Sequence, residues 1–295
     1  MDLRTALQTG FSQLRDGGVN APKLTAEVLL CHTLSKEHIF LLTHPEDLIA
    51  SFEMAQYDRA LRERVSGKPT QYITGKQEFW GREFKVSPAV LIPRPESEHL
   101  IETTLALARN RSAPRLFHHA DLPALTVAKR RRILDIGTGS GALAVTLALE
   151  LNTRVIATDI SADALAVARG NALRMRAPCS LVQCDLGAPF GNNSFDFIVC
   201  NPPYIATETI QTLQREVRDY EPRLALDGGS DGLDFYRRLI PEAARLLRLG
   251  GRLILEIGAD QGESVPELLV RPWRDVNLAQ DLAGRSRVVS AQRWG

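Results

Sequence analysis

Four residues that follow an apolar run carry the clearest chemical pattern in the sequence. Asn201, Pro202, Pro203 and Tyr204 come directly after Phe195–Cys200, a run that predicts a buried strand. Two successive prolines fix φ and supply no N–H, so the turn presents backbone carbonyls beside the Asn201 side-chain oxygen. Tyr204 adds an aromatic face on which a planar group can lie. The stretch is therefore predicted to hold a planar NH2 group by accepting its hydrogen bonds.

A glycine-rich loop upstream forms a second pattern, between a predicted strand and a predicted helix. It consists of Gly137, Thr138, Gly139, Ser140 and Gly141. Glycines at such a turn let the backbone approach a ligand that lies across the strand ends. Asp159 ends the next predicted strand, where its carboxylate can accept hydrogen bonds from both hydroxyls of a ribose. Asp185 and Leu186 end the strand after that, where they suit an exocyclic amine and the face of an adenine.

These three strand ends predict a cofactor that contains adenosine, and by themselves they do not separate S-adenosylmethionine from NAD. The Asn201 turn favours the first. An amide nitrogen is a poor nucleophile, and two acceptors, the Asn201 side chain and the Pro202 carbonyl, can steer its lone pair toward a sulfonium methyl group. We therefore predict Asn201, Pro202 and Tyr204 as catalytic residues, with Pro203 beside them in the substrate pocket. No strong base is required, because the proton becomes acidic only after methyl transfer.

Short apolar strands alternate with helical patterns from Arg131 onward, which is typical of a parallel, doubly wound sheet. The predicted strands cover 132–136, 154–158, 180–184, 195–200 and 252–256, and the helices lie near 141–151, 162–174, 232–248 and 261–270. Residues 276–278 and 287–290 can form a closing hairpin.

The first 66 residues have helical spacing instead. One helix ends at Gly17-Gly18, a second begins at Pro22, and Ser51 is the expected N-cap of a third that stops at Gly67. No catalytic spacing occurs in this region, so it is either a purely structural helical domain or a docking module for a partner. We favour the docking module, because so small a bundle rarely precedes an enzyme core without a role in recognition.

Between the two regions, two short strands are predicted around a turn at Gly81, then a strand over 90–96 that two prolines end, and a helix over about 96–109. Residues 110–130 lack periodicity and predict a solvated connection in which His118 and His119 are exposed. The predicted domains are a helical substrate-docking domain over 1–70, a β-hairpin linker over 71–93 and a catalytic domain over 94–295.

The composition is that of a soluble globular protein, with 44% hydrophobic and 24% charged residues. A net charge of +1 argues against a strongly basic nucleic-acid-binding protein. The four cysteines form no Cys-x-x-Cys pair and have no histidine at zinc-ligand spacing, so no metal is predicted. The N-terminus lacks a signal-peptide pattern, and no apolar run approaches the roughly 20 residues of a membrane span. We expect a cytoplasmic protein without a membrane partner.

The motifs together resemble a known family. Asn-Pro-Pro-Tyr after the fourth strand and Asp-Ile-Gly-Thr-Gly-Ser-Gly after the first are similar to class I methyltransferases that act on amino groups, and more closely to the peptide chain release factor N5-glutamine methyltransferases. Further matching stretches are Gln-Tyr-Ile-Thr-Gly at 71–75, Glu-Phe-Trp-Gly at 78–81, Leu-Ile-Pro-Arg-Pro-Glu-Ser-Glu at 91–98, Glu-Pro-Arg-Leu-Ala-Leu at 221–226, Asp-Gly-Leu at 231–233 and Arg-Val-Val at 287–289. Ser97 departs from the family's usual threonine but keeps the hydroxyl.

This resemblance implies a Rossmann-like sheet of seven strands, mostly parallel with the last strand antiparallel. It implies methylation of the glutamine in the Gly-Gly-Gln loop of class 1 release factors, with S-adenosyl-L-methionine as donor and S-adenosyl-L-homocysteine as product. The glycine loop, Asp159, Asp185 and Leu186 would contact the cofactor, and Asn201 would contact both cofactor and substrate. Leu91–Pro93 would roof the pocket.

Three alternatives stay open. The same mechanism could serve a glutamine of a ribosomal protein, although the run at 94–98 favours the release-factor type. A DNA adenine or rRNA guanine N-methyltransferase would suit the same turn, but it needs a wide basic face that the composition does not indicate, so no direct nucleic-acid contact is expected. A catalytically silent protein that only binds the cofactor is disfavoured by the intact Asn201 and Tyr204.

Overall fold

The computed structural model describes residues 1–109 and 131–295 and divides the chain into two compact units. The first unit comprises Met1–Lys76 with Leu213–Tyr220, and the second comprises Gln77–Thr212 with Glu221–Gly295. The predicted connection over 110–130, with its two histidines, lies outside the described residues. The helical unit has one hydrophobic core, and the second unit has two.

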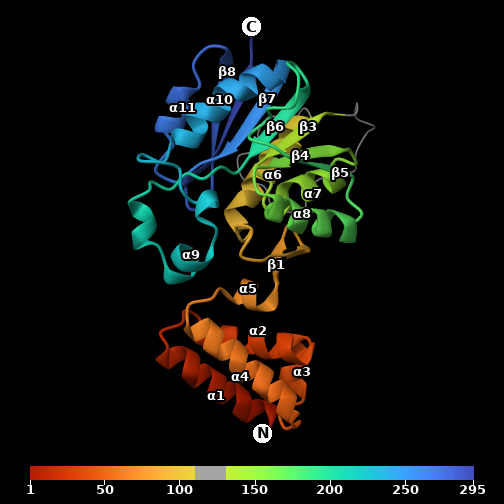
Figure 1. Cartoon of the computed structure of the whole chain (residues 1–295), viewed down its shortest axis with the longest axis vertical. Coiled ribbons are helices and arrows are strands. Elements are labelled where there is room, and N and C mark those ends of the chain that lie inside the picture. The colour runs from red at the N-terminus through yellow and green to blue at the C-terminus, as the bar shows by residue number, and fades with distance from the viewer. Residues whose placement is uncertain (110–130) are drawn as a thin grey trace. The chain divides into compact units, whose positions relative to one another are not determined.

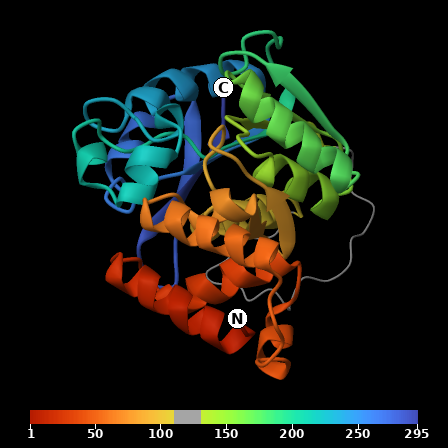
Figure 2. The ribbon, with the colours of Figure 1, turned by 60° about the horizontal axis from the view of Figure 1, so that its bottom comes forward.

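The first unit is a helical bundle (Figure 1). Its helices are α1 (Leu3–Asp16), α2 (Pro22–Leu34), α3 (His38–Thr43), α4 (Ser51–Val65), α5 (Thr70–Thr74) and α9 (Arg215–Tyr220). α1, α2 and α4 lie side by side (Figures 1 and 2) and bury a shared core that contains Leu14, Leu29 and Leu61. Arg64 of α4 is buried within this unit, and its guanidinium lies 2.5 Å from the carboxylate of Glu216 in α9.

The start of α4 differs from the prediction. Ser51 is the first residue of the helix, and Ala50 occupies the N-cap position. The Ala50 N–H donates to the Glu53 carboxylate at 3.0 Å, so an acidic side chain in the first turn replaces the expected serine cap. α3 was not predicted, because six residues are too few to display a helical period.

The second unit is built on a seven-stranded sheet. Its strands are β3 (Ile133–Ile136), β4 (Val155–Asp159), β5 (Cys179–Gln183), β6 (Phe195–Cys200), β7 (Leu247–Glu256), β8 (Trp273–Gln280) and β9 (Ser286–Arg293). Their order is β5-β4-β3-β6-β7-β9-β8. The first five are parallel, and β9 pairs antiparallel with both β7 and β8. The predicted fold class, with its antiparallel last strand and closing hairpin, is confirmed.

Helices cover both faces of this sheet (Figure 1). One core lies under α6 (Glu98–Ala108), α7 (Ala142–Glu150) and α8 (Ala162–Arg174), and the other lies under α10 (Asp234–Leu246) and α11 (Ser264–Leu268). Successive side chains of a strand point to opposite faces, so Ile133 enters the first core and Leu134 the second. All six residues of β6 are buried, which explains why this central strand is apolar apart from Asp196.

The segment before α6 corrects one prediction. Strands β1 (Lys76–Phe79) and β2 (Arg82–Lys85) form the expected hairpin around Gly81. The strand predicted over 90–96 is wrong: the chain forms a loop there and then a short 3₁₀ helix, η1 (Pro95–Ser97). Its two prolines have no N–H to offer a sheet, and the Ile92 N–H donates to the Glu221 carboxylate at 3.2 Å instead. Two further 3₁₀ turns are η2 (Thr209–Thr212) and η3 (Arg223–Ala225).

Candidate active site

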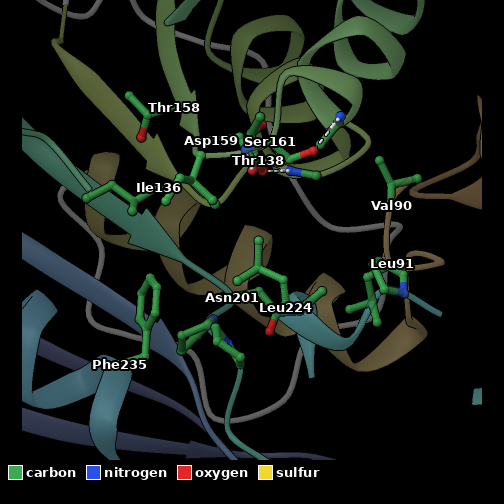
Figure 3. Close-up of a pocket in the computed structure, with 18 of the residues that line it drawn as sticks. Val90, Leu91, Ile136, Thr138, Thr158, Asp159, Ser161, Asn201, Leu224 and Phe235 are labelled. Atoms are coloured by element: carbon green, nitrogen blue, oxygen red, sulfur yellow. Dashed lines mark hydrogen bonds between the residues drawn. The ribbon is translucent and has the colours of Figure 1, made fainter. Parts of the chain in front are cut away.

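A cavity of about 550 Å³ opens at the carboxyl ends of β3, β4, β5 and β6. β3 has β4 on one side and β6 on the other, so the connections reverse direction there, which is where α/β sheets bind ligands. Figure 3 shows Thr138 and Asp159 on one side of the cavity and Asn201 and Leu224 on another. Most of the predicted site residues line it: Gly137, Thr138, Gly139, Ser140, Asp159, Asp185, Leu186, Asn201, Pro202 and Pro203.

The glycine loop is fixed to the neighbouring strand and open toward the cavity. The N–H groups of Gly137 and Thr138 both donate to the Thr158 carbonyl at 2.9 Å. Gly137 and Gly139 have φ of +73° and +54°, and a Cβ on either would meet no atom within 4 Å. The loop therefore forms a bare backbone cradle that a ligand can approach closely.

Gly141, at the end of the same loop, has a different environment. It is not among the lining residues but occupies the N-cap of α7, with φ of +82°. A Cβ there would lie 3.2 Å from the Cβ of Ala168, so the close packing of α7 on α8 accounts for the glycine.

The two aspartates of the predicted site are held differently. The Asp159 carboxylate accepts from the Gly139 N–H and the Ser161 N–H, both at 2.9 Å, which fixes its orientation beside the loop (Figure 3). Asp185 is half exposed and pairs with Arg238 at 2.5 Å. Leu186 next to it has φ of +50°, and its carbonyl accepts from the Thr158 hydroxyl at 2.9 Å. Asp159 is thus preorganised, whereas Asp185 has a competing partner.

The proline corner after β6 leaves its acceptors available. The Asn201 side-chain NH2 donates to the Ser97 hydroxyl at 2.9 Å. In the part of the chain that the structure describes, neither the Asn201 Oδ1 nor the Pro202 carbonyl accepts a hydrogen bond. Both residues line the cavity. The geometry thus brings two acceptors to the same cavity as the glycine loop.

Side chains and glycines behind the corner keep it in place. Gln261 donates from Nε2 to the carbonyls of Tyr204 and Gly232, at 3.1 Å each. Gly228 and Gly232 pack so closely that a Cβ on them would lie 2.9 Å from the Pro203 carbonyl oxygen and 2.4 Å from that of Tyr204, respectively. Movement of the corner is therefore opposed from behind.

Tyr204 itself is not among the residues that line the cavity. Its ring is partly buried and packs against the core under α10. Burial raises the pKa of its phenol, so the side chain stays neutral. The backbone of Tyr204 helps to form the corner, and the predicted contact of its ring with a substrate stays a prediction.

Two buried carboxyl groups belong to this region and were not predicted. Asp135 accepts from the Thr138 hydroxyl at 2.6 Å, and burial raises its pKa to about 7. Glu256 ends β7, and burial raises its pKa to about 7 as well. One signal was available in the sequence: each acidic residue directly follows apolar strand residues, Asp135 after Ile133 and Leu134, and Glu256 after Leu253–Leu255.

Apolar side chains cover the cavity from the loop before α6 and from η3. Val90, Leu91 and Leu224 lie around its edge (Figure 3), and Pro93 also lines it. These two segments are tied together, because the Arg94 guanidinium pairs with the Glu221 carboxylate, whose side chain is only 1% exposed. The segment that the family resemblance implied as a roof is thus anchored by an ion pair whose carboxylate is buried.

Within residues 1–109 and 131–295, no group of three or more His, Cys, Asp or Glu side chains is arranged to hold a metal ion. Of the helices described there, none has the length and apolar character needed to cross a bilayer.

The fold is similar to that of solved methyltransferases. A methyltransferase from Pyrococcus furiosus is 19% identical, covers 83% of this chain and 100% of its own, and superposes with a TM-score of 0.51. The hMettl16 catalytic domain is 15% identical, covers 90% of this chain and 91% of its own, and has a TM-score of 0.56.

Family models and individual relatives match more specifically. The PrmC N-terminal domain model matches residues 5–75, and the methyltransferase small domain model matches residues 119–229. A release factor glutamine methyltransferase of Moorella thermoacetica is 45% identical over 99% of both chains. Proteins of the same name from Koribacter versatilis and Bacillus anthracis are 41% and 37% identical, again over 99% of each chain. On this full-length similarity, the chain belongs to the family of release factor glutamine methyltransferases.

Proposed function

We propose that this chain transfers the methyl group of S-adenosyl-L-methionine to the side-chain amide nitrogen, N5, of the glutamine in the Gly-Gly-Gln motif of class 1 translation release factors, in the cytoplasm. The names of its relatives state release factor glutamine as the substrate of those proteins. The observation that carries the proposal is the pair of unengaged acceptors, Asn201 Oδ1 and the Pro202 carbonyl, in the cavity that the glycine loop borders.

The cavity fits the proposed cofactor. The bare backbone at Gly137 and Gly139 leaves room for close approach, and the fixed carboxylate of Asp159 retains lone pairs for ribose hydroxyls. Asp185 and Leu186 lie beyond it, where an adenine would need a hydrogen-bond acceptor and an apolar face. When bound, the cofactor supplies an electrophilic methyl group on a sulfonium.

The protein's contribution is orientation. Two acceptors hold the two N–H bonds of a glutamine amide and direct its lone pair, and such positioning supplies several kcal/mol of the barrier reduction, on the order of 7 or more in the best cases. The apolar roof of Leu91, Pro93 and Leu224 excludes water, which strengthens these hydrogen bonds. The proton leaves after transfer, so no strong base is needed.

We also propose that the helical unit binds the release factor outside the glutamine loop. Several large apolar side chains of this unit are exposed, among them Leu48 at 81% and Phe52 at 66%, and such side chains are typical of protein interfaces when they cluster. The charge-introducing variants Leu48→Glu and Phe52→Glu should raise KM for an intact release factor. They should leave KM for a short Gly-Gly-Gln peptide unchanged, and an equal rise for both substrates would contradict this role.

Incubation with isotope-labelled cofactor tests the proposed reaction. Intact release factor, a ribosomal protein with a methylatable glutamine, and DNA are offered separately, and the products are analysed by mass spectrometry. We expect the Gly-Gly-Gln peptide to gain one methylene unit of mass on its glutamine. Label in the ribosomal protein or in DNA, with none in the release factor, would refute the proposal.

A further inference from the structure

Two segments that are distant in the sequence line the cavity together. One is the glycine loop, which contributes Ser140, and the other is the segment after β2, which contributes Ala89 and Val90 (Figure 3). A cavity whose parts already have the positions of the bound state binds its ligand more tightly, because binding does not have to order them. The contacts that fix these two segments relative to each other therefore matter for affinity.

A single buried side chain is hydrogen-bonded to both segments. Asn171 lies in α8 and is 0% exposed. Its Nδ2 donates to the carbonyls of Ser140 and Lys85, at 2.9 Å each, and its Oδ1 accepts from the Lys85 N–H at 2.8 Å. Lys85 is the last residue of β2, shortly before Ala89. The amide of Asn171 thus ties the end of the hairpin to the glycine loop.

The three bonds require the particular chemistry of an asparagine. Its side chain carries two N–H donors and one acceptor oxygen on a flat group, and all three are used here. Toward Lys85 the amide offers one donor and one acceptor, as the backbone of a neighbouring strand would. An ionised aspartate of the same shape has no donor, and a leucine has neither donor nor acceptor.

The bond to Ser140 completes the anchoring of the loop. Gly137 and Thr138 are held by the Thr158 carbonyl, and the Gly139 N–H is held by a carboxylate of β4. These bonds fix the first part of the loop to β4. Asn171 holds the following residue, Ser140, from α8.

We propose that Asn171 is a positioning residue for the cofactor, which keeps the glycine loop and the segment after β2 in their binding-competent arrangement before the cofactor enters. This inference rests on the proposed function, because it assigns Asn171 a part in binding the same cofactor. Loss of the tie should lower the fraction of protein that is competent to bind, and the apparent Kd rises in inverse proportion to that fraction.

Calorimetry with S-adenosyl-L-homocysteine tests the tie without any methyl transfer. Asn171→Asp keeps the size of the side chain but loses both N–H donors, and Asn171→Leu loses all three hydrogen bonds. We expect the Kd to rise at least about tenfold in each variant, which corresponds to a competent fraction of about one tenth. A Kd within about twofold of wild type in both variants would overturn the inference.

Leu105→Ala is the matched control for a general loss of stability. It removes a side chain that is 1% exposed in the core under α6, α7 and α8 and that does not line the cavity. Urea denaturation identifies conditions in which all of the proteins are folded, and the Kd values are compared there. We expect Leu105→Ala to lower the free energy of unfolding and to keep the Kd within about twofold of wild type. An equal rise of the Kd in this control would show that destabilisation alone is the cause.

The kinetic parameters separate positioning of the cofactor from damage to the reaction site. The proline corner is held from behind by Gln261 and by the close packing of two glycines. The KM for the cofactor should therefore rise in the Asn171 variants as the Kd does, while kcat at saturating cofactor stays within about threefold of wild type. A fall of kcat with an unchanged KM for the cofactor would contradict the role assigned to Asn171.

Hydrogen exchange on wild-type protein keeps the inference testable if the variants do not fold. The Lys85 N–H is bonded to Asn171, and Lys85 does not line the cavity. Coupling between two sites is reciprocal, so a cofactor that prefers the tied state must also strengthen the tie. S-adenosyl-L-homocysteine should slow exchange of the Lys85 amide at least about tenfold and leave that of Arg285, in the turn between β8 and β9, unchanged. An unchanged rate at Lys85 would overturn the inference.

Failure of the proposed function gives a different result from failure of this inference. If wild-type protein does not bind S-adenosyl-L-homocysteine, the proposed cofactor and the role of Asn171 fail together. If it binds this nucleoside but methylates no release factor, only the proposed reaction fails. If wild type and both Asn171 variants bind it equally well, only the role of Asn171 fails.

Discussion

The substitution Gly232→Ala tests whether the rigidity of the proline corner matters for catalysis. Gly232 has φ of +75°, and a Cβ on it would lie 2.4 Å from the Tyr204 carbonyl oxygen and 3.0 Å from the Gln261 Nε2. Since real Cβ contacts are essentially never under 3.0 Å, the Tyr204 carbonyl must retreat by at least 3.0 − 2.4 = 0.6 Å. That displacement acts on the residue two positions after Pro202.

The expected cost has two parts. Placing an alanine at positive φ destabilises the fold by about 1 kcal/mol. Misplacing a reacting group by about 1 Å can lower the rate about a hundredfold, so a shift of about 0.6 Å should lower kcat between about tenfold and a hundredfold. Cofactor affinity should change little, because the glycine loop lies on the other side of the cavity from the corner.

Gly284 supplies a matched control. It lies in the turn between β8 and β9 with the same φ of +75°, and a Cβ on it would meet no atom within 4 Å. Gly284→Ala should therefore lower the free energy of unfolding in urea through its strained backbone alone, and it should keep the wild-type kcat. Methyl transfer to release factor and cofactor calorimetry are measured on both variants. If Gly232→Ala keeps kcat within about twofold of wild type, the argument from a rigid corner is refuted.

Three further predictions concern the same unit. Asn201→Ala should leave cofactor affinity measurable by calorimetry while kcat falls at least about a hundredfold, since it removes one of two positioning acceptors; near-normal turnover would exclude this role. Arg94→Ala removes the guanidinium from a carboxylate that is 1% exposed, and should lower the free energy of unfolding in urea by about 2 kcal/mol. Glu221→Gln should lower the free energy of unfolding by less. An unchanged free energy of unfolding in both variants would show that the pair does not anchor the roof. Asp135 has a pKa raised from 3.8 to about 7, so the folded state keeps a proton that the unfolded chain releases, and stability from this group is lost as the pH rises between these values. The free energy of unfolding of Asp135→Asn, measured in urea, should therefore rise relative to that of wild type between about pH 5 and about pH 7. A difference between the two proteins that does not vary with pH would contradict the burial argument.

Much of the second unit could be predicted from the sequence because its central strands, β3 and β6, are buried on both faces. A strand such as β6 then appears as a mostly apolar run that a polar residue, Asn201, follows. The parallel arrangement brings these ends to one edge, which is why the glycine loop, Asp159 and Asn201 could be predicted to share a cavity.

The parts that could not be predicted depend on contacts between residues distant in sequence. Ser97 and Asn201 are 104 positions apart in the sequence, and the residues next to either one do not indicate that the two form a hydrogen bond. The loop over 90–96 looked like a strand because Val90, Leu91 and Ile92 are apolar. In the structure Val90 and Leu91 line the cavity, and Ile92 is buried without joining a sheet. The packing of the Tyr204 ring against the core under α10 could not be predicted from the sequence, and its contact with a substrate stays a prediction.

The helical unit consists of two segments that are far apart in the sequence, which affects when it can finish folding during synthesis. Synthesis completes the first 76 residues long before the segment Leu213–Tyr220 exists, yet that segment is part of the same compact unit. Until it emerges from the ribosome, the buried guanidinium of Arg64 lacks the carboxylate of Glu216. The amino-terminal helices therefore reach their final state only after most of the catalytic half has been translated, and the maturation of the two halves is linked in time.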